Sequence, residues 1–82
     1  MRYTVTWTPS AQDELADIWM NAPDRQAVTA AQHRIDRTLR VDAHTKGQDY
    51  DGDRMLEEWP LVVVFTVSPD DRLVEVMSVT HV

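Results

Sequence analysis

The chain has 82 residues, of which 43% are hydrophobic and 27% are charged, and these values are typical of one small globular domain rather than of a disordered chain. It contains no cysteine, which excludes disulfides, thiol catalysis and cysteine-based zinc sites. Fourteen acidic and eight basic side chains give a net charge of −6, so the chain is not a general polyanion binder. Contact with nucleic acid would need a local basic patch.

The size and hydropathy of the chain also indicate how stable it is alone and in which compartment it is found. A domain this small buries only about 60% of the surface that its unfolded chain exposes, so we expect marginal stability alone or stabilisation by a partner. No apolar run reaches the length of a bilayer span, and the first residues lack the apolar segment of a signal peptide. We therefore expect a cytoplasmic protein with no membrane contact.

The first half of the chain predicts a strand followed by two helices. Residues 2–8 alternate apolar and polar side chains, as a strand does. Pro9 suits the first turn of a helix, and Ser10 with Asp13 resembles a capping pair. Asp24 is a good N-cap for a second helix, and the short link predicts an antiparallel helical hairpin. The apolar stripes of the two helices are Ala11, Leu15, Ile18, Trp19 and Ala22, and then Val28, Ala31, Ile35 and Leu39.

The second half predicts a loop and three strands. Residues 42–53 are polar, contain both glycines and are expected to form the loop. A short strand is expected at 54–56, a central strand at 61–67 because both of its faces are apolar, and a last strand at 73–79. A turn at 68–71, with proline in second position, would pair the last two antiparallel. The pattern does not decide which face of the last strand is buried.

The order β-α-α-β-β-β predicts one α+β domain over residues 1–82, with the helical hairpin packed on one face of a mostly antiparallel sheet. A pattern of apolar and turn positions also extends over nearly the whole chain. It includes Tyr3-x-Val5-x-Trp7-Thr8-Pro9-x-Ala11, Leu15-x-x-Ile18-Trp19, Asp24-Arg25-x-Ala27-Val28, Gly52-x-Arg54-x-Leu56 and Pro60-Leu61-x-Val63-x-Phe65-x-Val67. This pattern resembles the RelE/ParE superfamily, the toxins of bacterial type II toxin–antitoxin (plasmid stabilisation) systems.

The resemblance implies a growth-inhibiting toxin that is held inactive by a cognate antitoxin. One branch of the superfamily consists of mRNA interferases, which cleave mRNA on the ribosome without a metal, and another branch blocks DNA gyrase. The resemblance also implies a groove on the face of the sheet opposite the helices. We expect no metal and no cofactor.

Two residues match positions that the ribonuclease branch uses. Arg54 occupies the place of an arginine on the second strand, where a guanidinium would clamp phosphate oxygens. The alternative is a surface arginine paired with Asp51 or Asp53. His81 matches a terminal histidine that serves as acid or base in some members, and its usual pKa range suits proton transfer. The alternative is a residue in a frayed terminus.

Three further side chains are weaker candidates. Lys46 lies in the polar loop, where nuclease members carry basic residues that contact RNA. Glu57 and Glu58 precede the central strand, and Glu58 is the candidate general base. A plain loop lysine and exposed strand-end carboxylates are the alternatives. The residues Arg34, Arg37 and Arg40 form a stripe on the second helix that fits either RNA, an acidic antitoxin or a solvated face.

Departures from the ribonuclease pattern leave the function open. Pro60 stands where nuclease members carry an arginine, and Val82 stands where they carry an aromatic or basic residue. The carboxylates of Asp49, Asp51 and Asp53 would repel RNA phosphate. Three hypotheses therefore remain: ribosome-dependent cleavage, inhibition of a protein such as gyrase, and a catalytically degenerate module that only binds an antitoxin-like DNA-binding protein.

Overall fold

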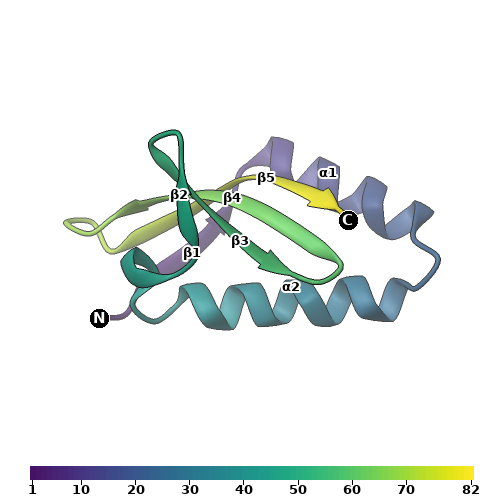
Figure 1. Cartoon of the computed structure of the whole chain (residues 1–82), viewed down its shortest axis with the longest axis horizontal. Coiled ribbons are helices and arrows are strands. Elements are labelled where there is room, and N and C mark those ends of the chain that lie inside the picture. Colours follow the sequence, from purple (N-terminus) through teal and green to yellow (C-terminus); the bar gives the residue numbers. More distant parts are fainter.

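The computed structural model describes all 82 residues as two helices and a five-stranded sheet (Figure 1). The strands lie in the order β1-β5-β4-β3-β2, with β1 parallel to β5 and every other neighbouring pair antiparallel. The elements are β1 (Thr4–Trp7), α1 (Pro9–Asn21), α2 (Arg25–Leu39), the 3-10 turn η1 (Ala43–Thr45), β2 (Gln48–Tyr50), β3 (Asp53–Glu58), β4 (Leu61–Ser68) and β5 (Leu73–His81). The predicted α+β class, helical hairpin and mostly antiparallel sheet are confirmed.

One apolar layer joins the helices to the sheet. In β4 alternate residues are fully buried and the residues between them are only partly buried, so one face of the sheet carries the core. The stripe predicted for the second helix is confirmed, since all four of its members are buried. The buried side chains of β4, β5 and α2 form one cluster and include no polar side chain. Neither helix is long and apolar enough to cross a membrane.

The segment 42–53 is not a simple loop, because it contains η1 and β2. The strand β2 pairs antiparallel with β3, and Asp51 and Gly52 join the two with φ angles of 51° and 94°. Positive φ at both central residues is the geometry of a tight hairpin turn, which Asp-Gly favours. The three residues of β2 are all exposed, so no apolar alternation marked them as a strand.

The two helix N-termini differ in how well the sequence predicted them. The cap of α1 is Thr8, whose Oγ1 accepts a hydrogen bond from the N–H of Ala11 at 3.1 Å, and not Ser10, which lies inside the first turn. Since Pro9 fits best at the first helical position, the residue before it is the cap. The predicted cap of α2 is confirmed, because Asp24 Oδ1 accepts from the N–H of Ala27 at 3.1 Å.

A bulge in β5 decides which face of that strand is buried. Val76 lies opposite Phe65 and Ser78 lies opposite Val64, so Met77 is an extra residue between the two pairs. The alternation therefore shifts by one residue, and Val74, Val76 and Val79 are all buried while Met77 is exposed.

The position of the cap gives a direct test of the start of α1. Replacing Thr8 with alanine removes an acceptor for an otherwise unpaired helix N–H, and we expect this to lower the free energy of unfolding by about 1 kcal/mol. Ser10→Ala, two residues further along in the first turn, should change the free energy of unfolding by less than about 0.5 kcal/mol. Urea denaturation followed by circular dichroism measures both. Equal losses in the two variants would show that the cap is not Thr8 alone.

Candidate functional site

The guanidinium group of Arg54 is bound to the chain's own backbone. Its Nε donates to the carbonyl of Lys46 at 2.7 Å, and its Nη2 donates to the carbonyl of Gly47 at 3.1 Å. The carboxylate of Asp49 accepts from Nη1 at 3.3 Å, so the ion-pair partner is Asp49 rather than Asp51 or Asp53. Arg54 thus fastens the strand β3 to the segment between η1 and β2.

Lys46 is brought next to Arg54 by the same contacts. Its carbonyl oxygen accepts from Arg54, and it follows η1 directly. The next residue, Gly47, has a φ of 69°, and a Cβ there would lie 2.3 Å from the carbonyl oxygen of Met55. Only glycine therefore allows the backbone to pass this close to β3. The two residues predicted to contact RNA are neighbours.

Glu58 lies at the other end of β3 and is held by α2. Its Oε1 accepts from Nε of Arg34 at 3.1 Å, and Nη2 of Arg34 donates to the carbonyl of Trp59 at 2.9 Å. The carboxylate of Glu58 is therefore already engaged by a cation of its own chain. The neighbouring Glu57 is exposed and makes no ion pair.

His81 closes β5 and is exposed. It pairs with Leu61 of β4, and it borders a small hollow at the end of α1 together with Asp17 and Asn21. No hydrogen bond fixes its ring, and Leu61 separates its strand from Glu58 on β3. The Cα atoms of His81 and Glu58 are therefore about 10 Å apart, two strand spacings.

The four predicted site residues do not converge on one point. Arg54 lies opposite Phe65 and His81 lies opposite Leu61, so they are separated by four residues along β4 and by two strand spacings across the sheet. This corresponds to about 16 Å between their Cα atoms. General acid–base catalysis needs groups within hydrogen-bond reach of the same substrate atoms. The chain brings together Lys46 and Arg54 at one end and places Glu58 and His81 toward the other.

The arginine stripe of α2 is also divided. Arg34 is engaged with Glu58, whereas Arg37 and Arg40 are exposed beside Asp36.

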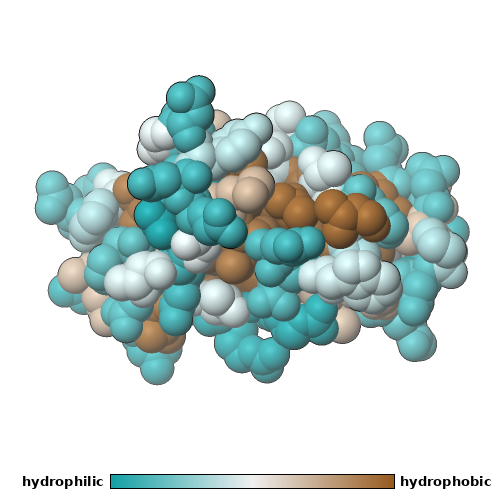
Figure 2. All heavy atoms as spheres, viewed as in Figure 1, coloured by the Kyte–Doolittle hydropathy of each residue, from teal (hydrophilic) through white to brown (hydrophobic).

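In the view of Figure 2, hydrophobic residues gather over the middle of the molecule and hydrophilic residues surround them. The face seen in Figure 2 is thus more suited to contacts with a protein than to a continuous phosphate track.

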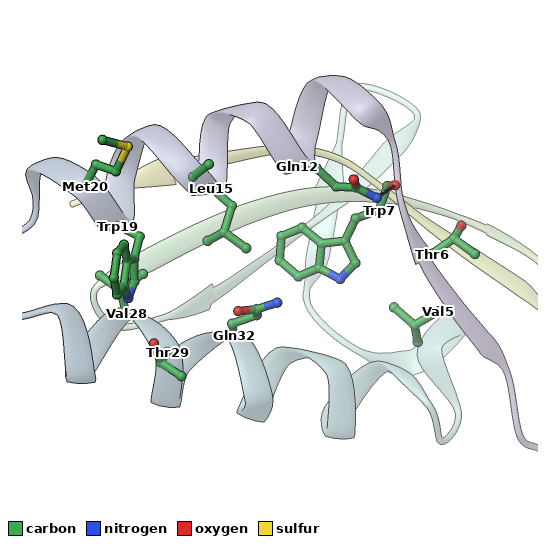
Figure 3. A pocket seen from close by; sticks show the side chains of 11 residues that line it. Val5, Thr6, Trp7, Gln12, Leu15, Trp19, Met20, Val28, Thr29 and Gln32 are labelled. Carbon is green, nitrogen blue, oxygen red and sulfur yellow. Dashed lines mark hydrogen bonds between the residues drawn. The ribbon is translucent and has the colours of Figure 1, made fainter.

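The largest hollow lies between the two helices, a feature that the sequence did not predict. The resemblance implied a groove on the opposite face of the sheet, but this cleft of about 990 Å³ is on the helix side (Figure 3). None of the side chains that line it is charged. They are Val5, Thr6, Trp7, Gln12, Leu15, Ala16, Trp19, Met20, Val28, Thr29 and Gln32.

Two tryptophans mark the cleft. The ring of Trp7 lies in the gap between the helices (Figure 3). Its Nε1 donates to Asp36 of α2 at 2.9 Å. Trp19 lies near the far end of the cleft, is 42% exposed and stacks under Arg25, whose guanidinium carbon is 4.6 Å from the ring centroid. Met20 beside it is 65% exposed. A signal for this cleft was present in the sequence, because the stripe predicted for the first helix includes Trp19 and a second large apolar residue, Met20, follows it directly.

No protein-family model matches the chain, and no curated protein matches it in sequence. Solved structures do share its fold. A chain of the toxin–antitoxin complex RelBE2 from Mycobacterium tuberculosis superposes with a TM-score of 0.78 at 15% identity, over 100% of this chain and 93% of that chain. A chain of the chromosomal ParDE toxin–antitoxin system from P. aeruginosa superposes with a TM-score of 0.67 at 20% identity, over 99% and 97% of the two chains. The chain therefore has the RelE/ParE fold, as the resemblance in sequence predicted.

The contacts of Arg54 predict a structural effect that can be separated from catalysis. Lysine keeps the charge but lacks the planar fork that reaches two carbonyls and a carboxylate at once. We expect Arg54→Lys to lower the free energy of unfolding by about 1–3 kcal/mol and to speed amide exchange in residues 46–50. Arg37→Lys, on the exposed face of α2, is the matched control and should have little effect. Unchanged exchange in Arg54→Lys would contradict this role.

Proposed function

We propose that the chain is the toxin of a type II toxin–antitoxin pair and that it inhibits growth by binding a protein target rather than by cutting RNA. The RelE/ParE fold supports the first part, since the two solved structures described above come from toxin–antitoxin systems. The second part is carried by one observation: the guanidinium of Arg54 is already bonded to two backbone carbonyls and to Asp49. Such a group is not free to clamp a phosphate.

Metal-free RNA cleavage needs a base at the ribose 2′-hydroxyl, an acid at the leaving oxygen and a cation at the phosphate. In this chain the base candidate Glu58 is paired with Arg34. The Cα atom of the acid candidate His81 is about 16 Å from that of Arg54. The net charge of −6 opposes binding to the ribosome's RNA. A topoisomerase such as DNA gyrase, the protein target that the family resemblance suggests, fits these observations better.

Ribosome-dependent mRNA cleavage is the second candidate, and the adjacency of Lys46 and Arg54 favours it. In that mechanism Arg54 would exchange its carbonyl contacts for phosphate oxygens, and Glu58 would leave Arg34. Both changes break hydrogen bonds to charged groups, which contribute about 1.5–3 kcal/mol each. Substrate binding would have to offset that cost.

A cognate antitoxin is the proposed partner in the cytoplasm. The cleft between α1 and α2 leaves apolar side chains uncovered, with Trp19 and Met20 exposed at its rim. Burial of these side chains by the antitoxin would stabilise the toxin through linkage. We propose neither a metal nor a cofactor.

The proposal predicts that His81 is dispensable for growth inhibition. On induction from a tight promoter in a bacterial host, we expect wild type and His81→Ala to stop growth equally, with DNA supercoiling changing before the rate of translation falls. His81 is exposed, so its removal tests chemistry without unfolding the chain. His33→Ala, at an exposed position of α2, is the matched control. Optical density, pulse-labelled protein synthesis and plasmid topology are the measurements.

Two outcomes would redirect the proposal. A rapid fall in translation that His81→Ala abolishes and His33→Ala does not would establish the ribonuclease reading. Unaffected growth with folded protein in the cell would favour the third hypothesis, a degenerate module whose only role is complex formation. Co-expression of the neighbouring reading frame then tests for the antitoxin, because a cognate partner should co-purify with this chain.

A further inference from the structure

The helix α1 carries an acidic row on the side that faces away from the sheet. Asp13, Asp17 and Met20 follow the spacing of one helix face, three and four residues apart, and all three are exposed. Buried Ala11 and half-buried Ile18 lie on the opposite side of the helix. The helix contains no basic residue, so Asp13 and Asp17, here called the acidic row, set the charge of its outer side.

The helix α2 has an outer row of the same spacing and the opposite charge. His33, Arg37 and Arg40 are exposed and lie on the side opposite the buried stripe of this helix. These three residues are called the basic row. The carboxylate of Asp36 lies beside them, but it already accepts from Nε1 of Trp7 at 2.9 Å.

The charges of the two rows have no partner within the chain. Its ion pairs lie at the amino terminus, at Arg34 and at Arg54, and no residue of either row takes part in one. The apolar cleft opens between the rows, with Trp19 and Met20 exposed at its rim (Figure 3). The outer face of the helical hairpin therefore has an uncharged centre with opposite charges on its two sides.

Such a face is complementary to a second copy of itself. Two copies can meet through it about a two-fold axis that runs across the cleft or about one that runs along the cleft. The axis across the cleft puts α1 against α1 and α2 against α2, so like charges meet. The axis along the cleft puts α1 of each copy against α2 of the other, so unlike charges meet twice and the two clefts face one another. The charges therefore select the axis along the cleft.

An occupant of a single charge fits this face less well. Phosphate groups of a nucleic acid would pair with the basic row, but Asp13 and Asp17 would repel them. A basic peptide would pair with the acidic row and be repelled by Arg37 and Arg40. A second copy presents both charges in the matching order.

We propose that the chain forms a two-fold dimer with a second copy of itself through the outer faces of α1 and α2. The acidic row of each copy lies against the basic row of the other, and Trp19 and Met20 of both copies are buried between them. The inference goes beyond the proposed function, because it concerns the chain without any other partner. Since the antitoxin of the proposed function would cover the same cleft, dimer and complex exclude each other.

The size of the face predicts a weak, reversible dimer. The helices have 13 and 15 residues and are about 20 Å long, and two helices side by side are about 20 Å wide. Such a face is at the small end of specific interfaces, and two chains of net charge −6 also repel each other. We expect a dissociation constant of about 10–100 µM.

Sedimentation velocity of the purified full chain tests the dimer, and charge reversal tests its arrangement. Wild type should change from monomer to dimer between about 1 and 500 µM. Asp13→Lys with Asp17→Lys, or Arg37→Glu with Arg40→Glu, should each weaken the dimer at least about tenfold, because like charges then meet at both contacts. An equimolar mixture of these two variants should form a heterodimer as strong as the wild-type dimer, because both of its contacts again pair unlike charges.

The matched control reverses two carboxylates outside this face. Glu57 on β3 and Asp70 in the turn before β5 are both exposed. Glu57→Lys with Asp70→Lys makes the same change in net charge as reversal of the acidic row, and both changes reduce the overall repulsion between chains. The control should therefore leave the dimer unchanged or strengthen it, whereas reversal of the acidic row weakens it.

Cysteine cross-linking reports directly which helices meet, because the chain has no cysteine of its own. A mixture of Asp13→Cys and Arg37→Cys chains should be joined by a short bismaleimide. Neither variant alone should be joined, because the axis along the cleft keeps each of these positions away from its own copy.

Each other outcome overturns the proposal. A monomer over the whole concentration range would exclude the dimer, and a dimer that survives reversal of either row would exclude the charge pairing. Cross-linking of Asp13→Cys to itself would place α1 against α1, and equal weakening by the control would show that the effect is not local to this face. Growth arrest takes no part in these measurements, so a monomeric toxin fails only here, and a dimer that arrests nothing fails only the proposed toxicity.

Discussion

The pairing of β4 with β5 supports every other part of this fold, and the bulge at Met77 lets both halves of β5 face the core. The strand β1 pairs with β5, β3 pairs with β4 and carries β2 on its other edge, and both helices contact these two central strands. Without the extra residue, Val79 would face away from the helices while Val74 and Val76 faced them, and one of the three would be lost from the core. The bulge also leaves the N–H of Val79 accessible to α1, where Oε1 of Glu14 accepts it at 3.1 Å. Backbone irregularity and helix docking are therefore linked in one contact.

The two helices are each held by the sheet more than by one another. The core side chains of α2 pack on β3 and β4, whereas α1 lies over β5. In this domain of 82 residues the space between the helices is left open as the cleft, with Trp19 exposed near its end. The same small size explains why a partner would gain much by covering it, because even a few buried side chains contribute several kcal/mol.

The sequence was sufficient to predict a helix or strand, and its buried face, where one hydrophobic periodicity extends over the whole element. The stripe of α2 and the apolar run of β4 were found because each keeps one repeat from end to end. The last strand was also predicted, but its buried face was not. The bulge at Met77 shifts the alternation by one residue in the middle of the strand, so no single alternation fits both halves. The strand β2 was missed because its three residues are exposed, so their side chains show no apolar alternation. The strand is held by its pairing with β3 and by the contacts of Arg54, and neither leaves a pattern within β2 itself.

The candidate site shows a further limit of reading residue types along a chain. An arginine on β3 matches a phosphate clamp and a backbone clamp equally well in sequence, because both uses exploit the same fork of donors. What separates them is the carbonyl groups of Lys46 and Gly47, which reach Arg54 only because a glycine with positive φ lets the backbone approach β3. Spacing in sequence carries no signal for such a contact. The distance between Arg54 and His81 is likewise set by strand register, which the turn lengths constrain only loosely.

The unpaired edge of β1 is protected by its position rather than by charge. The other edge strand, β2, is only three residues long and carries Asp49, both common means of preventing sheets from joining edge to edge. In β1 the open part consists of Val5 and Trp7, whose side chains are hydrophobic and would invite such pairing on a flat surface. The cleft that these two side chains line has walls from both α1 and α2, so helices flank this part of the strand. The two edges of the sheet therefore differ: β2 is short and carries a charge, whereas β1 is longer, carries apolar side chains and lies beside the helices.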